Sequence, residues 1–273
     1  RRPAQRLRAG DHVALEAPTR RRVVDRDAPD ALDVRFEDDT LLVVVKPAGV
    51  SVHPSPRGTG STLLDALRAH AAQSGGEWEP RLVQRLDRGT SGLLVVAKSA
   101  DTHRALQAPS AAFAKTYLAL VWGRPSPRSG LIDAPIGRSP LDRRRVMVRG
   151  SGAPALTRYR VLARGRGGAL GLSLVECQLV TGRMHQIRVH LASKGWPIVG
   201  DTVYTHAPLP RLGDLALDRA ARSFGRQALH AWRLEFRHPR SGTRLTFDSA
   251  PPSDIFAVLT RSNLQSSSTR STR

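Results

Sequence analysis

Residues 83–92 read Val83-Gln84-Arg85-Leu86-Asp87-Arg88-Gly89-Thr90-Ser91-Gly92 and lead directly into the apolar segment Leu93-Leu94-Val95-Val96-Ala97-Lys98. The apolar segment has the length and composition of a buried strand. The segment before it places one carboxylate, that of Asp87, in a Gly-containing turn between the guanidinium groups of Arg85 and Arg88. Such an acid either caps the turn by bonding to its backbone or takes part in chemistry. These residues alone leave both interpretations open.

Strand and helix patterns alternate along the rest of the chain. Apolar or alternating segments predict strands at residues 41–45, 82–86, 93–98, 117–122, 157–163, 170–179, 229–236 and 244–247. Apolar residues at helical spacing predict helices at residues 61–72, 102–107, 182–194 and 254–259. Ser61 or Thr62 caps the first helix, residues 143–149 predict a basic edge strand or loop, and residues 165–168 predict a turn. We therefore expect an α+β fold in which a large mixed, mostly antiparallel β-sheet is flanked by helices.

The composition is that of a globular protein. At 273 residues, of which 40% are hydrophobic, the chain can bury a sizeable core, as one large domain or two subdomains. Its longest apolar runs, residues 41–45 and 93–97, are far shorter than the ~20 residues that cross a bilayer. No signal-peptide pattern opens the chain and Cys177 is its single cysteine, so neither secretion nor a disulfide framework is supported. We expect a cytoplasmic protein without a membrane span.

The chain is strongly basic. Its formal net charge is +20, from 43 Lys and Arg residues against 23 Asp and Glu residues. Residues 1–26 contribute +5 and residues 261–273 contribute +3, which leaves +12 on the middle of the chain. Such a surplus is expected either of a protein that binds a polyanion or of a solvated, Arg-rich surface. The basic residues beside Asp87 favour the first interpretation, with nucleic acid as the partner.

Six short motifs are spread over roughly residues 35–258. They are Lys46-Pro47-Ala48-Gly49-Val50, Arg85-Leu86-Asp87-Arg88-Gly89-Thr90-Ser91-Gly92, Lys115-Thr116-Tyr117-Leu118-Ala119, Thr181-Gly182-Arg183-Met184-His185-Gln186-Ile187-Arg188-Val189-His190, Gly200-Asp201-Thr202-Val203-Tyr204 and Leu229-His230-Ala231. In residues and order they resemble the motifs of the RluA family of RNA pseudouridine synthases. The resemblance implies the pseudouridine synthase catalytic fold and an enzyme that isomerises uridine to pseudouridine in structured ribosomal or transfer RNA. We expect it to act as a monomer.

The same resemblance also predicts the domain organisation. We expect a catalytic domain at residues 34–260, between a weakly ordered segment at residues 1–33 and a disordered tail at residues 261–273. Residues 7–15 resemble the last strand of the small RNA-binding module that precedes the catalytic domain in many family members. Because too little of that module remains to fold and no initiator Met is present, we expect the chain to begin inside it.

Pseudouridine formation breaks the bond between the anomeric carbon and a uracil nitrogen, turns the base, and rejoins it to the sugar through a carbon atom. These steps need no redox partner, group donor or metal ion. The sequence contains no paired-Cys or His-Glu metal signature, phosphate loop or dinucleotide fingerprint, so we expect no cofactor and no metal. By resemblance, Asp87 is the reactive carboxylate, acting as nucleophile at the anomeric carbon or stabilising its developing positive charge.

An aspartate nucleophile must stay ionised, which a nearby guanidinium favours. Arg183 is the first candidate, because it lies at the expected start of a helix, where the helix N-terminus adds positive potential. A plain phosphate contact is the alternative role for Arg183. Arg188 can take the ion-pair role instead, and the sequence does not decide between the two arginines.

The resemblance also implies roles for other residues. Tyr117 is expected to pack against the target base and to handle the proton at the 2′ carbon of the sugar, with a buried structural tyrosine as the alternative. Arg85 is expected to fill the space left by the extruded uridine or to stack on displaced bases. Ile198, Val199 and Leu229 are expected as walls of the uracil pocket. The residues expected to bind substrate are Arg85, Arg88, Lys115, His185, Gln186, Arg188, Ile198 and Leu229.

Gln84 departs from the family pattern, in which His usually precedes the arginine. Gln donates and accepts hydrogen bonds but cannot titrate or stack as His does, so the departure bears on the extrusion contact rather than on catalysis. One alternative function is therefore a non-catalytic RNA-binding paralogue on the same fold, against which Asp87, Tyr117 and Arg183 argue. Another is a nucleoside-cleaving hydrolase, which would need a second acid to activate water; the motifs offer Asp87 no such partner.

Overall fold

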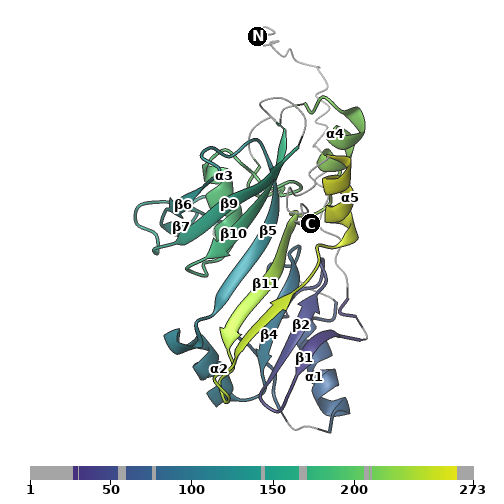
Figure 1. The fold of residues 1–273 in the computed structure, drawn as a ribbon, viewed down its shortest axis with the longest axis vertical. Helices are drawn as coiled ribbons and strands as arrows, with labels where there is room; N and C mark the ends of the chain where they lie inside the picture. The colour runs from purple at the N-terminus through teal and green to yellow at the C-terminus, as the bar shows by residue number, and fades with distance from the viewer. Residues whose placement is uncertain are drawn as a thin grey trace, which may run out of the picture.

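The computed structural model describes residues 27–29, 31–54, 60–75, 78–142, 145–165, 171–205, 209 and 211–262. Within these residues a ten-stranded sheet forms the centre of the molecule (Figure 1). Its strands are β1 (Asp33–Glu37), β2 (Leu41–Lys46), β3 (Arg81–Leu82), β4 (Ser91–Ala97), β5 (Ala114–Trp122), β6 (Ser129–Asp133), β9 (Leu156–Arg164), β10 (Leu172–Leu179), β11 (Leu229–Arg237) and β12 (Arg244–Asp248).

The strands follow the order β1-β2-β4-β11-β5-β10-β9-β6, with β12 beside β11 and β3 beside β4. Every pair is antiparallel except β4 with β11, which run parallel where Ser91 faces His230. The predicted large mixed, mostly antiparallel sheet is therefore confirmed. The parallel pair brings together two motifs that are far apart in the sequence, because β4 follows the Asp87 loop and β11 begins with Leu229-His230-Ala231.

Helices cover this sheet, as predicted. The described helices are α1 (Leu63–Gln73), α2 (Ala100–Gln107), the 3-10 helix η1 (Pro109–Ala111), α3 (Gln186–Ser193), α4 (Leu215–Arg222) and α5 (Ser253–Arg261). α1 begins as predicted, with Thr62 as its cap: the Thr62 side chain accepts from the Asp65 amide, and the Asp65 carboxylate accepts from the Thr62 amide.

The continuous apolar runs of β2 and β4 are explained by burial on both faces of the sheet. On one face, Leu42 and Leu94 pack in the same cluster as Leu63 of α1. On the other face, Leu93 packs in a separate cluster with Leu106 of α2, together with other residues of β2, β4 and β11. A strand covered on both sides shows no alternation of polar and apolar residues, which is why these segments read as uninterrupted hydrophobic runs.

A small hairpin, β7 (Ile136–Arg138) and β8 (Val146–Val148), lies apart from the main sheet and packs against α3. Ile136, Val146 and Val189 form part of a third apolar cluster, which also includes the ring of Tyr204. Residues 146–148 thus form a strand within the predicted basic segment 143–149, of which residues 143–144 lie outside the described residues.

Several sequence predictions differ from the structure at the ends of elements. The predicted strand at 82–86 is limited to β3, because residues 83–90 form the loop that carries Asp87. The helix predicted at 182–194 begins only at Gln186. Elements β1, β6, β7 and α4 were not predicted. The expected segment 1–33 falls mostly outside the described residues, as do residues 166–168 of the predicted turn and residues 263–273 of the expected tail.

None of the helices in the described ranges is long and apolar enough to cross a membrane.

Candidate active site

Asp87 lies in the loop that joins β3 to β4. The Thr90 amide donates to the Asp87 carbonyl oxygen (2.9 Å), which closes a turn, and β4 begins at the next residue. Gly92 has a φ of +118°, and a Cβ at this position would lie 2.2 Å from the Ala231 carbonyl oxygen in β11. The close approach of β11 to the end of this turn therefore requires glycine at position 92.

The ammonium group of Lys46 fixes the same loop. Its Nζ donates to the carbonyl oxygens of Pro47 (2.7 Å), Val50 (2.9 Å) and Arg88 (3.1 Å). These bonds use all three N–H donors of a side chain that is fully buried. Burial lowers the pKa of Lys46 to about 7, an effect that the nearby Asp87 carboxylate opposes. Lys46 thus connects the turn of its own motif to the backbone beside Asp87.

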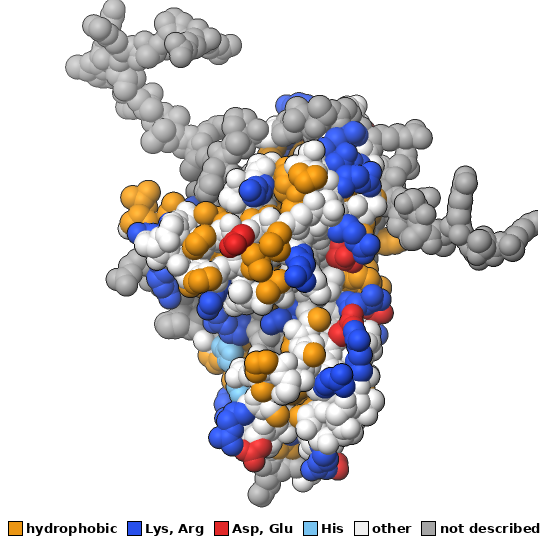
Figure 2. Space-filling view, turned by 60° about the vertical axis from the view of Figure 1, so that its left-hand side comes forward, with side chains coloured by type: hydrophobic (Ala, Val, Ile, Leu, Met, Phe, Trp, Pro, Cys, Tyr) orange, Lys and Arg blue, Asp and Glu red, His pale blue; other side chains and the backbone are white. Residues whose placement is uncertain are grey.

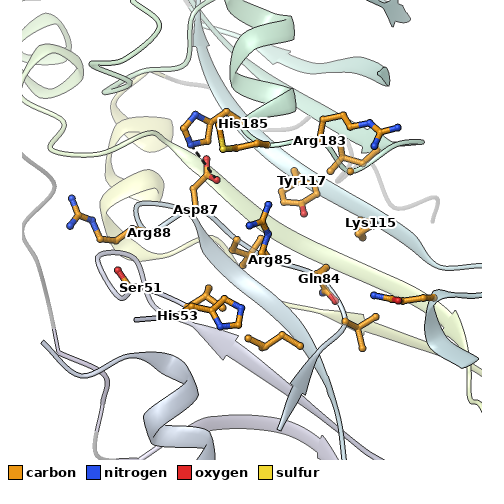
Figure 3. Close-up of a pocket in the computed structure, with 18 of the residues that line it drawn as sticks. Ser51, His53, Gln84, Arg85, Asp87, Arg88, Lys115, Tyr117, Arg183 and His185 are labelled. Carbon is orange, nitrogen blue, oxygen red and sulfur yellow. Dashed lines mark ion pairs between the residues drawn. The ribbon is translucent and has the colours of Figure 1, made fainter. Parts of the chain in front are cut away.

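Arg188 is the ion-pair partner of Asp87. Its Nη1 donates to Asp87 Oδ2 at 2.7 Å. Arg183, the first candidate from the sequence, makes no such pair: its Nε donates to the Pro154 carbonyl oxygen (3.1 Å), and its side chain points away from Asp87 in Figure 3. The physical reason is the start of α3. Because the helix begins at Gln186, Arg183 lies in the preceding loop, and Arg188 is the arginine on the first helical turn.

The Gln186 side chain determines the shape of that preceding loop. Its Oε1 accepts from Thr181 Oγ1 (2.8 Å) and from the Arg183 amide (2.9 Å). Its Nε2 donates to the Leu156 carbonyl oxygen and to Thr157 Oγ1, both at 2.9 Å. Every donor and acceptor of the amide is therefore used within the protein. Gln186 also lines a small recess beside Asp87, and its predicted contact with substrate stays a prediction.

His185 contacts Asp87 from a different direction than Arg188. Its Nδ1 lies 2.8 Å from the Tyr204 hydroxyl, and its Nε2 lies 3.8 Å from Asp87 Oδ1 (Figure 3). His185 has a left-handed backbone conformation, with φ at 52°, which turns the chain into α3. Burial lowers the pKa of His185, although the Asp87 charge opposes the shift, so the neutral ring predominates at pH 7. The structure thus places His185 at the site, as the sequence predicts.

Tyr117 lies in β5 and lines the cavity that contains Asp87 (Figure 3). The residue is 5% exposed. Burial, with a smaller contribution from the charge of Asp87, raises the pKa of Tyr117 well above its ordinary value. The phenol therefore keeps its proton at neutral pH and can pack against a base without adding charge to the site.

Asp87 opens into a cavity of about 670 Å³, which is within the size range of small-molecule sites. The lining residues are Ser51, Val52, His53, Leu82, Val83, Gln84, Arg85, Leu86, Asp87, Arg88, His103, Gln107, Lys115, Tyr117, Leu179, Gly182, Arg183, Met184 and His185. They come from the β2–α1 and β3–β4 loops, the ends of β3 and β10, α2, β5 and the loop before α3. The predicted substrate residues Arg85, Arg88, Lys115 and His185 are among them.

The predicted walls of the uracil pocket separate into two groups. Leu229 lines a smaller recess of about 60 Å³, together with Asp87 and Tyr117. Ile198 and Val199 line neither this recess nor the larger cavity, because their segment pairs with β5: Val121 and Ile198 form a bridge, and both residues are almost fully buried. Neither hollow supports the predicted wall role of Ile198 and Val199, which stays a prediction.

Gln84, which lines the cavity, has a buried side-chain amide without hydrogen bonds in the described part of the chain. Both amide atoms, Oε1 and Nε2, are buried, and neither has a hydrogen-bond partner within the described part of the chain. An unpaired buried amide costs about 1–3 kcal/mol. The position that departs from the sequence pattern is thus also a polar side chain that the fold leaves unsatisfied.

Sequence reasoning missed Asp201, whose motif was noted without a role. Asp201 is 3% exposed and holds Arg188 through two hydrogen bonds, from Nε to Oδ2 (2.7 Å) and from Nη2 to Oδ1 (3.0 Å). The available signal was an acid two residues after the apolar pair Ile198-Val199. A buried acid needs a partner, but the sequence does not indicate which arginine supplies it.

The cavity lining is basic, with Arg85, Arg88, Lys115 and Arg183 against the single acid Asp87. Figure 2 shows Lys and Arg side chains spread over one face of the molecule, with fewer acidic side chains among them. Among the described residues there is no group of three or more His, Cys, Asp or Glu side chains that could hold a metal ion.

Comparisons with known proteins agree with this geometry. A model of the RNA pseudouridylate synthase family matches residues 40–193. Ribosomal large subunit pseudouridine synthase D of Nitrosomonas europaea is 44% identical over 231 residues, covering 84% of this chain and 64% of that protein. The Zymomonas mobilis protein of the same name is 39% identical over 278 residues, covering 96% of this chain and 83% of that protein. The chain thus spans less than two thirds of the length of the first relative.

One solved structure extends the likeness to the fold. Human RNA pseudouridylate synthase domain containing 4 is 27% identical to this chain and superposes with a TM-score of 0.67. The match covers 85% of this chain and 93% of the human one.

Proposed function

The chain belongs to the RNA pseudouridylate synthase family, and we propose that it converts uridine to pseudouridine in RNA, with Asp87 as the reactive carboxylate. The observation that carries this proposal is the setting of Asp87, which lines a cavity of nucleotide size and pairs with the buried guanidinium of Arg188. The guanidinium orients this carboxylate, which lines the space that a ribose can enter.

The reaction assigned to Asp87 conserves all atoms. One carboxylate oxygen attacks the anomeric carbon, or stabilises its positive charge, while the bond to uracil N1 breaks and its electron pair leaves with the base. The base turns, C5 of uracil forms the new bond to the anomeric carbon, and the carboxylate is released. The proton lost from C5 is matched by one gained at N1, so the product is an isomer of uridine.

We assign Tyr117 the packing role rather than the proton-transfer role at this step. Its raised pKa makes the phenol a poor base at neutral pH, whereas a flat, neutral ring beside Asp87 can support the base as it turns. Leu229, which lines the small recess next to both residues, forms an apolar wall for the same base.

A uridine within a structured RNA has to leave its stack to reach Asp87. Arg85 is exposed, lines the cavity and is two residues from Asp87, so it is placed to occupy the space that the uridine vacates. The positive charge of the chain favours binding of the RNA backbone around the site.

The substrate class assigned to this chain is ribosomal RNA of the large subunit, because two relatives carry that substrate in their names. Transfer RNA is the second candidate. With a substrate of either kind, we propose a cytoplasmic protein that acts as a monomer, with residues 34–260 as its catalytic domain.

A nucleoside hydrolase would need a second carboxylate to activate water beside Asp87. Asp201 is the carboxylate that shares Arg188 with Asp87, and its side chain is 1% exposed and fully engaged with that arginine and the backbone. It cannot hold a water against a sugar in the cavity, so base release is disfavoured relative to isomerisation.

The direct test is product analysis. Purified protein is incubated with transcripts of bacterial large-subunit ribosomal RNA and, separately, of transfer RNA; the RNA is then digested, and pseudouridine, uridine and free uracil are quantified. We expect pseudouridine with no free uracil, and more of it from the ribosomal transcript. Free uracil would identify a hydrolase, and tight RNA binding without either product would identify a non-catalytic binder.

A further inference from the structure

Two carboxylates share one guanidinium at the centre of the site. Asp201 accepts from Nε and Nη2 of Arg188, at 2.7 and 3.0 Å, whereas Asp87 accepts from Nη1 at 2.7 Å. The two parallel bonds to Asp201 fix both the plane and the direction of the guanidinium. The edge that remains, with Nη1, faces Asp87.

Asp201 is held rigidly in this position. Its Oδ1 also accepts from the backbone amides of Val203 (3.0 Å) and Tyr204 (3.3 Å). The guanidinium lies over the Tyr204 ring, at 5.1 Å from the ring centre. Asp201 lines neither the cavity nor the recess at Asp87. RNA in the cavity therefore does not contact Asp201, and any influence of Asp201 on the reaction has to pass through Arg188.

We propose that Asp201 is a positioning residue that aims Arg188 at Asp87 and offsets most of the guanidinium charge. The inference rests on the proposed function, since its effect on the rate exists only if Asp87 reacts with uridine. The three ionised side chains carry a net charge of −1, and the part that faces the cavity is on Asp87. Arg188 therefore orients Asp87 without neutralising it, which preserves the electron density that attack at the anomeric carbon requires.

The first test is Asp201→Asn, which keeps the shape of the side chain but removes its charge and one acceptor. We expect the single-turnover rate at saturating RNA to fall about 10- to 100-fold, because a small misplacement of a catalytic group has an effect of this size. RNA affinity should stay within about threefold of wild type, because Asp201 does not line the cavity. An unchanged rate would overturn the proposal.

Asp218→Asn is the matched control. Asp218 is as buried as Asp201, and it likewise accepts from an arginine Nε (Arg222, 2.8 Å) and from a backbone amide (Leu212, 3.0 Å). It lines neither cavity at Asp87. We expect Asp218→Asn to lower the thermal midpoint as much as Asp201→Asn does, while its rate stays within about threefold of wild type. Equal rate losses in the two variants would show that Asp201 affects the rate only through the stability of the fold, and would contradict the proposal.

The pH–rate profile provides a further test, because a loss of stability alone does not change the pH at which the rate falls. The Asp201 charge is one of those that raise the pKa of His185, so its removal should lower that pKa and move an acid limb set by His185 to lower pH in Asp201→Asn. The other charged or titratable groups at the site are those that line the cavity or recess or interact with Asp87: Lys46, His53, Arg85, Arg88, His103, Lys115, Tyr117, Arg183, Arg188 and Tyr204. A limb that moves to higher pH would contradict the proposal.

A second test repeats Asp201→Asn in the Arg188→Lys variant. It separates the orientation of Arg188 by Asp201 from the effect of the Asp201 charge alone. An ammonium group cannot bind both carboxylates through a fixed fork, so Asp201 competes with Asp87 for it. In this background Asp201→Asn should cost less than about threefold, or should increase the rate. The same 10- to 100-fold loss in both backgrounds would show that Asp201 acts independently of Arg188.

One measurement remains valid even if no pseudouridine forms. In an ¹H–¹⁵N spectrum, the Arg188 Nε–H signal, identified by its absence from Arg188→Lys, should be sharp and slow to exchange with water. It should lose this protection in Asp201→Asn but keep it in Asp87→Asn. If the Arg188 Nε–H signal is unprotected in wild type, Asp201 does not hold Arg188 as proposed, whatever the activity. If the signal is protected while wild type forms no pseudouridine, the proposed function fails, but the positioning of Arg188 by Asp201 is upheld.

Discussion

Arg188 and Asp87 are 101 residues apart in the sequence, yet Arg188 Nη1 lies 2.7 Å from Asp87 Oδ2. The contact joins the first turn of α3 to the loop between β3 and β4. The Arg188 side chain is 7% exposed and the Asp87 side chain 26%, so the guanidinium is shielded from water while the carboxylate remains open to the cavity. The ion pair thus fixes the position of the carboxylate and leaves it accessible from the cavity.

Replacing the two arginines of the basic motif should have unequal effects on the chemical step. We expect Arg188→Ala to lower the single-turnover rate by at least about a thousandfold, because Asp87 loses its orienting charge partner. Arg183→Ala should stay within about tenfold, because Arg183 bonds to the Pro154 carbonyl oxygen and not to Asp87. Rates measured at saturating RNA exclude differences in binding. A larger loss for Arg183→Ala than for Arg188→Ala would reverse this assignment.

Arg85→Ala should act before chemistry. If Arg85 fills the space of the extruded uridine, its loss destabilises the flipped state by part of the unstacking cost of a few kcal/mol. A target uridine supplied in an unpaired RNA should then rescue Arg85→Ala at least partly, and should not rescue Arg188→Ala. Single-turnover rates on folded and unfolded RNAs of one target sequence provide the comparison, with binding of both RNAs verified. Equal rescue of both variants, or of neither, would show that Arg85 has no separate role in extrusion.

The buried Gln84 amide should lower the free energy of unfolding of the protein without RNA. Gln84→Met removes two buried polar atoms that have no partner in the described residues and keeps a similar volume. We expect the free energy of unfolding to rise by about 1 kcal/mol. Gln227→Met is the control, because its Nε2 donates to Thr90 Oγ1 (3.1 Å) and its loss should cost about 1 kcal/mol. Denaturant unfolding measures both. A destabilised Gln84→Met would mean that the amide is already satisfied.

Lys46 should give the fold a specific pH dependence. Its pKa is about 7 in the folded protein against an ordinary 10.5, so between these values the unfolded chain binds one proton more. Stability then rises with pH, by about 1.4 kcal/mol per pH unit. The difference in unfolding free energy between wild type and Lys46→Met should grow at this rate between about pH 8 and 9.5. A flat difference would show that Lys46 stays charged in the fold, held by its three carbonyl acceptors.

The sequence predicts the sheet well where the signal is local. β2 and β4 read as strands because both faces of each are covered, which leaves an uninterrupted apolar run. α1 could be placed from Thr62 and the apolar residues that follow. By contrast, α4 has only eight residues, and its two buried apolar residues, Leu217 and Ala221, are too few to establish a helical period.

The partner of Asp87 could not be predicted for a different reason. The start of α3 depends on bonds from Gln186 to Leu156 and Thr157, which lie about 30 residues earlier in the chain. A shift of a few residues in that start decides whether Arg183 or Arg188 lies on the first helical turn. Periodicity within the motif does not contain this information, because it is fixed by tertiary contacts.

Asp87→Asn tests the central claim most directly. The substitution removes the reactive oxygen anion while keeping the size and shape of the side chain, so pseudouridine formation should become undetectable. RNA affinity should remain within about tenfold of wild type, and the folded state should persist. The measurement is pseudouridine formed per enzyme in a single turnover on large-subunit ribosomal RNA, with wild type alongside. Turnover above about one per cent of wild type would contradict the assignment of Asp87 as the group that attacks the sugar.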